Sequence, residues 1–258
     1  MSLKKIIFII TSICLASLLF ACIAKTETKV NATVNTEASR DTKELVVNKE
    51  VKDISDVEDG KTYQTIKYTV ITCENNEVLQ KSLDELNAKM KKDAENFKAE
   101  HAEEIRNFIK ENTDMQEAEY ANTSDITFVR QDDKYLCLIE FVYTNTMGAH
   151  GMYYQNGYTY DVKTGQKLGI FDFVKDKEEL RAYLKKWIKD NSNEYDFFDE
   201  ASNAVIDAYV DGEYELQFYI NKDLTVMFQP YDIAPYAAGL IEVKLDKSLL
   251  KVDLGDIW

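Results

Sequence analysis

The chain has 258 residues, of which 46 are acidic and 31 are basic, so its formal charge is −15. A chain this acidic, with no run of Lys or Arg, lacks the clustered cations that nucleic-acid phosphates require. Its 45% hydrophobic and 12% aromatic residues exclude a wholly disordered protein. Four cysteines exclude a disulfide-dense scaffold. We therefore expect an acidic globular protein that binds no nucleic acid.

The N-terminus, residues 1–22, has the pattern of a bacterial lipoprotein signal. Two lysines precede an uncharged, mainly apolar run at 6–20, which is shorter than the roughly 20 apolar residues of a permanent transmembrane helix. The run ends in Leu-Phe-Ala-Cys at 19–22, which resembles a lipobox. We predict export, cleavage before Cys22 and a lipid anchor (diacylglyceryl, palmitate) on that thiol, facing the extracytoplasmic side of the membrane. The alternatives are an uncleaved signal anchor or ordinary secretion.

The segment after the signal predicts a linker. Residues 23–59 contain no aromatic residue, no Pro and no Gly, and they are rich in Lys, Glu, Thr, Asn and Val. Such a segment buries too little apolar surface to offset the entropy of ordering. We therefore predict a flexible tether there and a folded part that starts near Gly60. The folded part is expected to comprise two subdomains, 60–152 and 153–250, followed by a C-terminal tail at 251–258.

The predicted elements follow from hydrophobic periodicity. Alternating β-branched runs indicate strands, and apolar residues at steps of three and four indicate helices. In chain order we predict a strand at 61–73, one helix or two in sequence at 77–111, strands at 125–130, 134–144, 152–161 and 166–173, a helix capped by Asp176, a short helix at 197–208, and strands at 214–220, 224–229 and 239–245. The expected fold class is α+β, with mainly antiparallel sheets, helices packed on one face and two closely joined subdomains.

Two cysteines remain in the expected folded part. Cys73 and Cys137 each lie in an apolar, strand-like run. An exported protein with two such residues can form one disulfide, and two buried free thiols are the alternative.

Two stretches hold the candidate ligand-binding residues. The first, residues 146–151 (TMGAHG), places His150 between two small residues. The second, residues 228–239 (FQPYDIAPYAAG), contains both prolines of the chain, so we predict a rigid connection between two strands that presents Tyr231 and Tyr236. Either these tyrosines form a preorganised aromatic ledge for a sugar ring or a partner protein, or they fill the edge of the core. His150 is either a ligand contact or a turn residue bonded to nearby backbone.

Together and in this order, the two stretches resemble the paired domains DUF4163 and DUF3298. The family's first stretch reads GGAHG, and Met147 here replaces its first Gly; its second reads YEIAPYAAG, and Asp232 here replaces its Glu. The resemblance covers about residues 60–250. It implies similarity to the outer region of lysozyme-sensing anti-sigma factors, to the non-catalytic part of a peptidoglycan deacetylase, and to stand-alone lipoproteins. We expect a stand-alone lipoprotein, with His150, Tyr231, Asp232 and Tyr236 as its ligand-binding candidates.

No catalytic or metal-binding pattern accompanies these residues. The two histidines, His101 and His150, lie in separate predicted elements, and the sequence has no zinc spacing, G-x-S-x-G, P-loop, Rossmann fingerprint or calcium loop. We expect no cofactor and no metal. The leading hypothesis is a membrane-anchored, non-catalytic binding module for peptidoglycan or a wall-directed protein such as lysozyme, whose cationic surface the acidic chain would attract. The alternatives are an envelope deacetylase or glycosidase with an unrecognised site, and a structural envelope protein.

Overall fold

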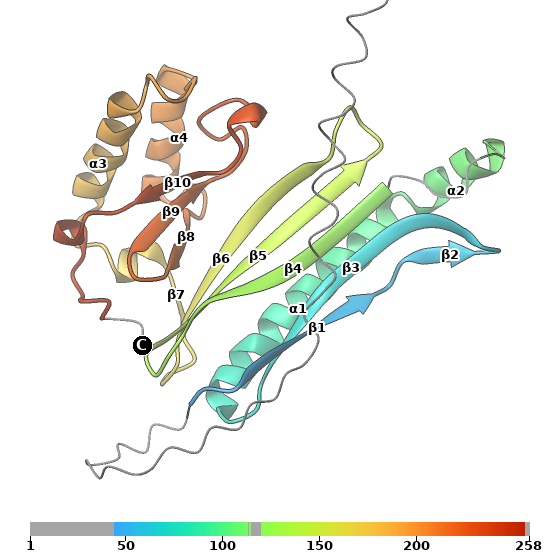
Figure 1. Ribbon diagram of the computed structural model, residues 1–258, viewed down its shortest axis with the longest axis horizontal. Helices are drawn as coiled ribbons and strands as arrows, with labels where there is room; N and C mark the ends of the chain where they lie inside the picture. The colour runs from blue at the N-terminus through green and yellow to red at the C-terminus, as the bar shows by residue number, and fades with distance from the viewer. Residues whose placement is uncertain (1–43, 113, 115–119, 256–258) are drawn as a thin grey trace, which may run out of the picture. The chain divides into compact units, whose positions relative to one another are not determined.

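The computed structural model describes residues 44–112, 114 and 120–255. The predicted signal, the lipidation residue Cys22 and the last three residues of the predicted tail lie outside these ranges. Within them, none of the helices has the length and apolar character needed to cross a membrane. The fold class is the predicted α+β one, with two sheets and four α-helices in the described part of the chain (Figure 1).

The larger sheet has seven strands and curls into a half-barrel. Its order is β1-β3-β4-β5-β6-β7, and β2 also pairs with β3. The strands are β1 (Val47–Asp53), β2 (Asp56–Glu58), β3 (Lys61–Cys73), β4 (Tyr120–Gln131), β5 (Tyr135–Thr146), β6 (Met152–Asp161) and β7 (Lys167–Leu168). All these neighbours are antiparallel except β3 and β4. A parallel pair needs a long crossover connection, and two helices provide it.

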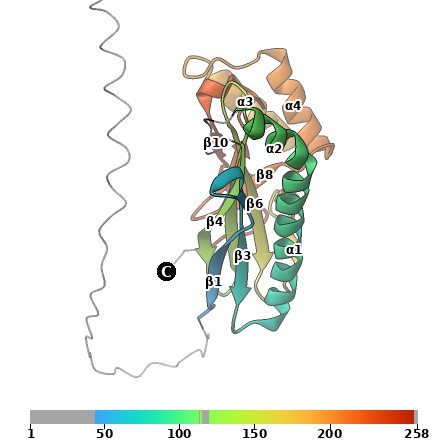
Figure 2. The ribbon, with the colours of Figure 1, turned by 90° about the vertical axis from the view of Figure 1, so that its right-hand side faces the viewer.

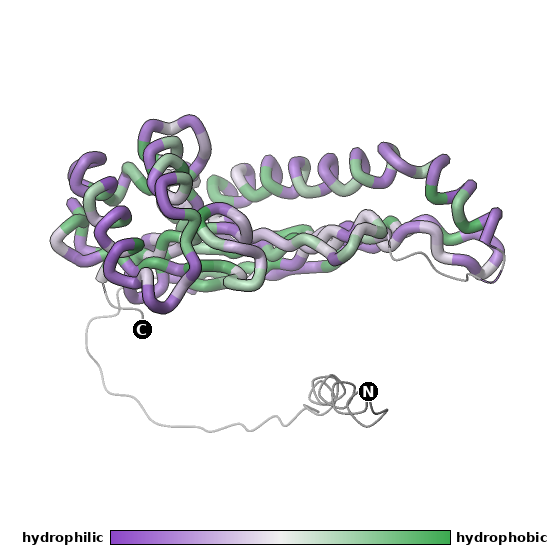
Figure 3. Tube along the Cα trace, turned by 90° about the horizontal axis from the view of Figure 1, so that it is seen from above, coloured by the Kyte–Doolittle hydropathy of each residue, from purple (hydrophilic) through white to green (hydrophobic). Residues whose placement is uncertain are grey.

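The crossover helices are α1 (Glu77–Glu100) and α2 (Ala102–Glu111). As predicted, α1 packs one apolar stripe against the sheet along which it runs (Figures 2 and 3). The buried residues of this stripe are Leu79, Leu83, Leu86, Met90 and Ala94. The side-chain amide of Asn87 on the same helix bonds both the N–H and the C=O of Ile71 at 2.8 Å. The helix therefore covers the backbone of β3 beyond its short pairing with β4.

The predicted helical stretch is two helices because it breaks at His101. This residue ends α1 with φ −123° and ψ 13°, outside helical geometry. Its ring lies edge-on to Tyr120 with the ring centres 5.6 Å apart, and the side chain is partly exposed. His101 is therefore a packing residue at a helix junction.

The smaller sheet has the order β10-β9-β8. Its strands are β8 (Gln217–Ile220), β9 (Leu224–Phe228) and β10 (Ile241–Lys244), and α3 (Lys177–Asp190) and α4 (Glu200–Asp211) share its core. Asp176 caps α3 as predicted, because its carboxylate accepts the N–H groups of Glu178 and Glu179. The core of this sheet also takes in Cys137 from β5.

The tether prediction is wrong for the described part of its range. Residues 44–59 contain β1 and β2, and β1 pairs with β3 over all seven of its residues. Five of those seven residues are exposed, so the amino-acid composition of this segment does not indicate a strand. The pairing of β1 with β3 depends on backbone hydrogen bonds, which need no apolar side chain. Residues 23–43 of the predicted tether lie outside the described residues.

The boundary between the two parts also differs from the predicted one. Both β6 and β7 belong to the larger sheet, so the change of sheet comes after Leu168 and not at residue 152. The predicted strand at 166–173 is only two residues long, because a 3₁₀ turn at Ile170–Asp172 follows it.

The two cysteines are free thiols in the structure. Cys73 belongs to the cluster between α1 and the larger sheet, whereas Cys137 belongs to the cluster of the smaller sheet. The structure therefore agrees with the alternative prediction of two buried free thiols and not with a disulfide, because the two side chains pack into different clusters. Burial raises the pKa of the Cys137 thiol to about 11, which keeps it protonated at neutral pH.

Candidate aromatic binding face

The tertiary structure brings the two candidate stretches together. His150 lies in the turn between β5 and β6, and Tyr236 lies in the connection between β9 and β10. Their rings are stacked, with centres 4.3 Å apart and an angle of 25° between the planes. The Tyr236 hydroxyl also donates a hydrogen bond to the carbonyl of Gly151 at 2.8 Å. The contact joins residues 85 positions apart in sequence.

Three further rings extend this contact. Tyr231 lies 5.5 Å from Tyr236, Tyr153 of β6 meets Tyr236 edge-on at 5.6 Å, and Phe141 of β5 stacks on Tyr153 at 5.8 Å. We call these three residues, together with His150 and Tyr236, the aromatic face. Tyr231 is 49% exposed and Phe141 is 40% exposed. Exposed aromatic side chains that carry polar tips combine apolar contact area with hydrogen bonding, so this face is suited to binding.

The backbone at Tyr231 is held in an unfavourable conformation. Its φ is +73°, in the left-handed region that costs an L-residue about 1–2 kcal/mol. Asp232 stabilises this turn, because its carboxylate accepts hydrogen bonds from the Gln229 N–H and the Tyr209 hydroxyl, both at 2.7 Å. Burial raises the pKa of Asp232 above its ordinary value, and these two hydrogen bonds partly oppose that shift. Asp232 therefore positions the turn and is not part of the aromatic face.

The side chain of Gln229 ties this connection to the larger sheet. Its oxygen accepts the N–H of Gln155 at 2.8 Å, and its amide nitrogen donates to the Gln155 carbonyl at 2.9 Å. The aromatic face is thus built on strand backbone and on a connection bonded to that backbone. Rigid placement lowers the entropy that side chains lose on binding.

Three of the four predicted ligand-binding residues lie on this face: His150, Tyr231 and Tyr236. The sequence reasoning missed Tyr153 and Phe141, because only the register of β5 against β6 places them beside the two stretches. Met147 has φ +61°. Gly adopts this left-handed conformation without the strain that the side chain of Met adds.

The aromatic face consists of aromatic rings and has no cluster of metal-binding side chains among the described residues. Among residues 44–112, 114 and 120–255, no three His, Cys, Asp or Glu side chains gather closely enough to hold a metal ion. On the connection, the Asp232 carboxylate and the Tyr236 hydroxyl both have intramolecular hydrogen-bond partners. The face therefore offers a ligand partly exposed ring surface, together with the hydroxyl of Tyr231.

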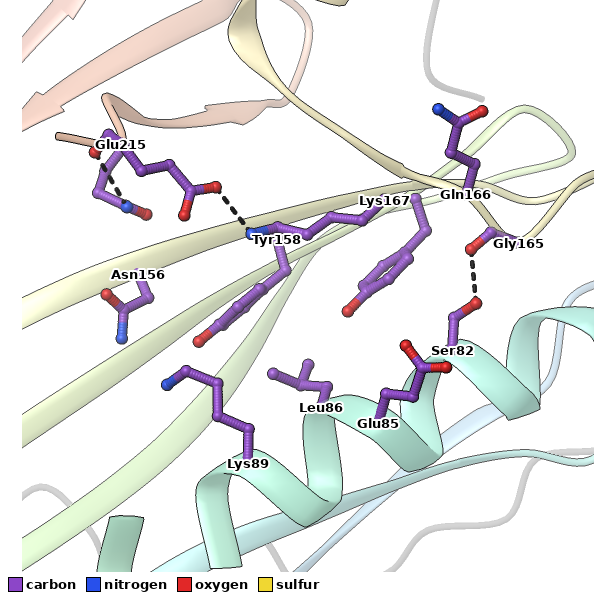
Figure 4. Close-up of a pocket in the computed structure, with 12 residues that line it drawn as sticks. Ser82, Glu85, Leu86, Lys89, Asn156, Tyr158, Gly165, Gln166, Lys167 and Glu215 are labelled. Atoms are coloured by element: carbon purple, nitrogen blue, oxygen red, sulfur yellow. Dashed lines mark hydrogen bonds and ion pairs between the residues drawn. The ribbon is translucent and has the colours of Figure 1, made fainter. Parts of the chain in front are cut away.

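A separate cavity of about 440 Å³ lies between α1 and β6 (Figure 4). None of the predicted binding residues lines it. The sequence carried no signal for it, because its walls come from α1, from β6, from the turn before β7 and from the segment that leads into β8.

The comparisons with known proteins support the second half of the resemblance. Residues 171–248 match the family described as "Protein of unknown function (DUF3298)". A DUF3298 family member from Bacteroides fragilis NCTC 9343 has a similar structure, with a TM-score of 0.58 and 17% identity over 81% of this chain and 94% of that chain. A DUF3298 family protein from Pseudomonas aeruginosa PAO1 has a TM-score of 0.50 and 16% identity over 81% of this chain and 96% of that chain. At these identities the similarity concerns the fold alone. No curated protein matches the chain.

Proposed function

We propose that the chain is an exported, lipid-anchored and non-catalytic binding module of the cell envelope. Its aromatic face would bind peptidoglycan or a wall-directed protein such as lysozyme. The observation that supports this proposal is the convergence of both sequence stretches in one stacked set of partly exposed rings. The strained backbone of Tyr231, which the hydrogen bonds of Asp232 hold in place, supports the proposal further, since such strain is concentrated at functional sites.

Charge and aromatic contact make separable contributions to such binding. The formal charge of −15 attracts a cationic protein over about a Debye length, roughly 8–10 Å at physiological salt, and mainly speeds association. The rings act after contact, because buried aromatic side chains slow dissociation. Raising the salt concentration should therefore lower the association rate constant and leave the dissociation rate constant almost unchanged.

The test is the binding of hen lysozyme to the immobilised protein, with Tyr231→Gly as the main variant. Glycine removes the ring and accepts the positive φ of this position without strain, so loss of folding does not confound the result. Loss of a buried aromatic anchor should raise the dissociation rate about 30-fold, the equivalent of about 2 kcal/mol. Tyr214→Ala is the matched control, because Tyr214 is 66% exposed and lies outside the aromatic face.

The second arm of the test is co-sedimentation with purified peptidoglycan, using the same two variants. Weaker binding of either ligand by Tyr231→Gly, with Tyr214→Ala unchanged, supports the proposal and identifies the ligand. If both variants bind both ligands as the unaltered protein does, the aromatic face is structural and the proposal fails.

A further inference from the structure

The cavity between α1 and β6 is lined by charged, aromatic and amide side chains. The helix contributes Glu85 and Lys89, and β6 contributes the rings of Tyr158 and Tyr160 (Figure 4). The remaining lining residues are Ser82, Leu86, Asn156, Gly165, Gln166, Lys167, Glu215 and Gln217. Its volume of about 440 Å³ lies within the range of small-molecule sites.

Internal bonds hold these walls in place. The Ser82 hydroxyl donates to the carbonyl of Gly165 at 2.6 Å, which fixes the turn before β7 against the helix. On the β6 side, the Tyr158 hydroxyl and the Asn156 amide both donate to the carboxylate of Glu140 at 2.9 Å. Glu140 is only 4% exposed. A buried carboxylate that holds two lining side chains makes this a preformed site.

The charges around the cavity are unequally paired. Lys89 bonds Asp93 at 2.8 Å, and Lys167 bonds Glu215 at 2.7 Å, so both cations already have an anion. No hydrogen bond or ion pair in the described part of the chain involves Glu85. Its carboxylate raises the pKa of the Tyr160 hydroxyl, an effect smaller than that of burial. The unmatched charge facing the cavity is therefore negative.

The tyrosine wall already attracts a cation. The ammonium of Lys167 lies 5.4 Å from the ring centre of Tyr158, within the distance of a cation–π contact. An ammonium group between Glu85 and this wall would gain a charge-assisted hydrogen bond and contact with electron-rich rings. A ligand anion there would meet the Glu85 carboxylate, whereas the two lysines are already paired with Asp93 and Glu215.

We propose that this cavity is a binding site for a small protonated amine. The ammonium group lies at the Glu85 carboxylate, the body of the ligand lies against Tyr158 and Tyr160, and its hydroxyl groups bond the side-chain amides of Asn156 and Gln166. This site is independent of the aromatic face and of the ligand proposed for it.

The test is isothermal titration calorimetry of the whole protein with tyramine and tyrosol, which differ only in an ammonium in place of a hydroxyl. Tyramine should bind saturably, and tyrosol should bind at least about tenfold more weakly, as expected for loss of a hydrogen bond to a charged group. Glu85→Gln should weaken tyramine binding by about tenfold to a hundredfold. Glu95→Gln is the matched control, because it removes the same charge from the same helix at a residue that does not line the cavity.

Three results would overturn the proposal: no saturable heat with about 10 mM tyramine, equal affinity for tyrosol, or equal weakening by the Glu85 and Glu95 variants. The last result would indicate general charge attraction without a site. The Tyr231→Gly variant should bind tyramine as the unaltered protein does, which separates this test from that of the aromatic face.

Discussion

At the scale of single residues, Gly157 decides how closely the two sheets approach. It lies on β6, and a Cβ atom there would stand 1.9 Å from the carbonyl oxygen of Phe218 on β8. Its own N–H donates to the side-chain oxygen of Gln217 at 2.9 Å. The smaller sheet can therefore pack backbone to backbone against β6 only because this position lacks a side chain.

We predict that Gly157→Ala lowers the free energy of unfolding by about 2 kcal/mol or more, since a methyl group there forces the two strands apart. Urea unfolding followed by tyrosine fluorescence measures the change. Gly148→Ala is the control: a Cβ atom there meets nothing nearer than 4.0 Å, and its effect should stay within about 0.5 kcal/mol. Equal effects of the two substitutions would show that the sheets do not depend on this close approach.

At the scale of elements, β1 and β2 show why an edge strand escapes composition-based reasoning. For β2 a local signal exists. Asp59 and Gly60 both have positive φ, at 51° and 75°, in the turn between β2 and β3. An Asp-Gly dipeptide before an alternating run indicates a hairpin, so the strand before it could have been predicted. The position of β1 could not, because its exposed residues carry no apolar alternation.

We predict that a chain starting at residue 60 is markedly less stable than one starting at residue 44. The shorter chain loses the seven paired residues of β1 and the buried side chain of Leu45, and it exposes one edge of β3. Loss of these backbone pairs should cost about 3 kcal/mol or more, and the open edge favours aggregation. Thermal unfolding and size-exclusion chromatography compare the two chains; equal stability would mean that β1 contributes nothing to the fold.

At the scale of the whole molecule, buried Cys and Tyr side chains make the free energy of unfolding depend on pH in the alkaline range. Burial raises the pKa of Cys137 to about 11 and that of Tyr120 to about 12. Burial also raises the pKa values of Tyr158, Tyr160 and Tyr209. In the unfolded chain these groups ionise near their ordinary pKa values of 9.0 for Cys and 10.0 for Tyr. The folded state therefore keeps protons that the unfolded state has released.

We predict that the free energy of unfolding changes little between about pH 7 and pH 8 and falls above about pH 9, by about 1.4 kcal/mol per pH unit for each group that is ionised only in the unfolded state. Urea unfolding between pH 8 and pH 11 measures this dependence, and phenolate absorbance should rise together with unfolding. Stability that does not change over this range would contradict the burial of these groups.

The membrane attachment is also a property of the whole molecule, and it stays a prediction from the sequence. Cys22→Ala should release the protein from the membrane fraction or leave the precursor uncleaved, because the variant lacks the thiol on which the predicted lipid would be carried. Fractionation with immunoblotting distinguishes the two. A variant of mature length that remains in the membrane fraction would argue against lipidation.

Features that depend on local periodicity could be predicted without the structure. The apolar stripe of α1, the alternation of β3 and the Asp176 cap all lie where they were predicted. The rigid connection between β9 and β10 was also readable, because its two prolines exclude a strand.

Contacts between segments far apart in the chain became visible only in the folded structure. The stacking of His150 on Tyr236, the arrival of Tyr153 and Phe141 beside them, and the cavity between α1 and β6 all depend on strand register and sheet packing. The membership of β1 and β6 in the larger sheet depends on the same contacts. Such contacts join residues far apart in the chain, and their free energy comes from pairing and burial that no local pattern records.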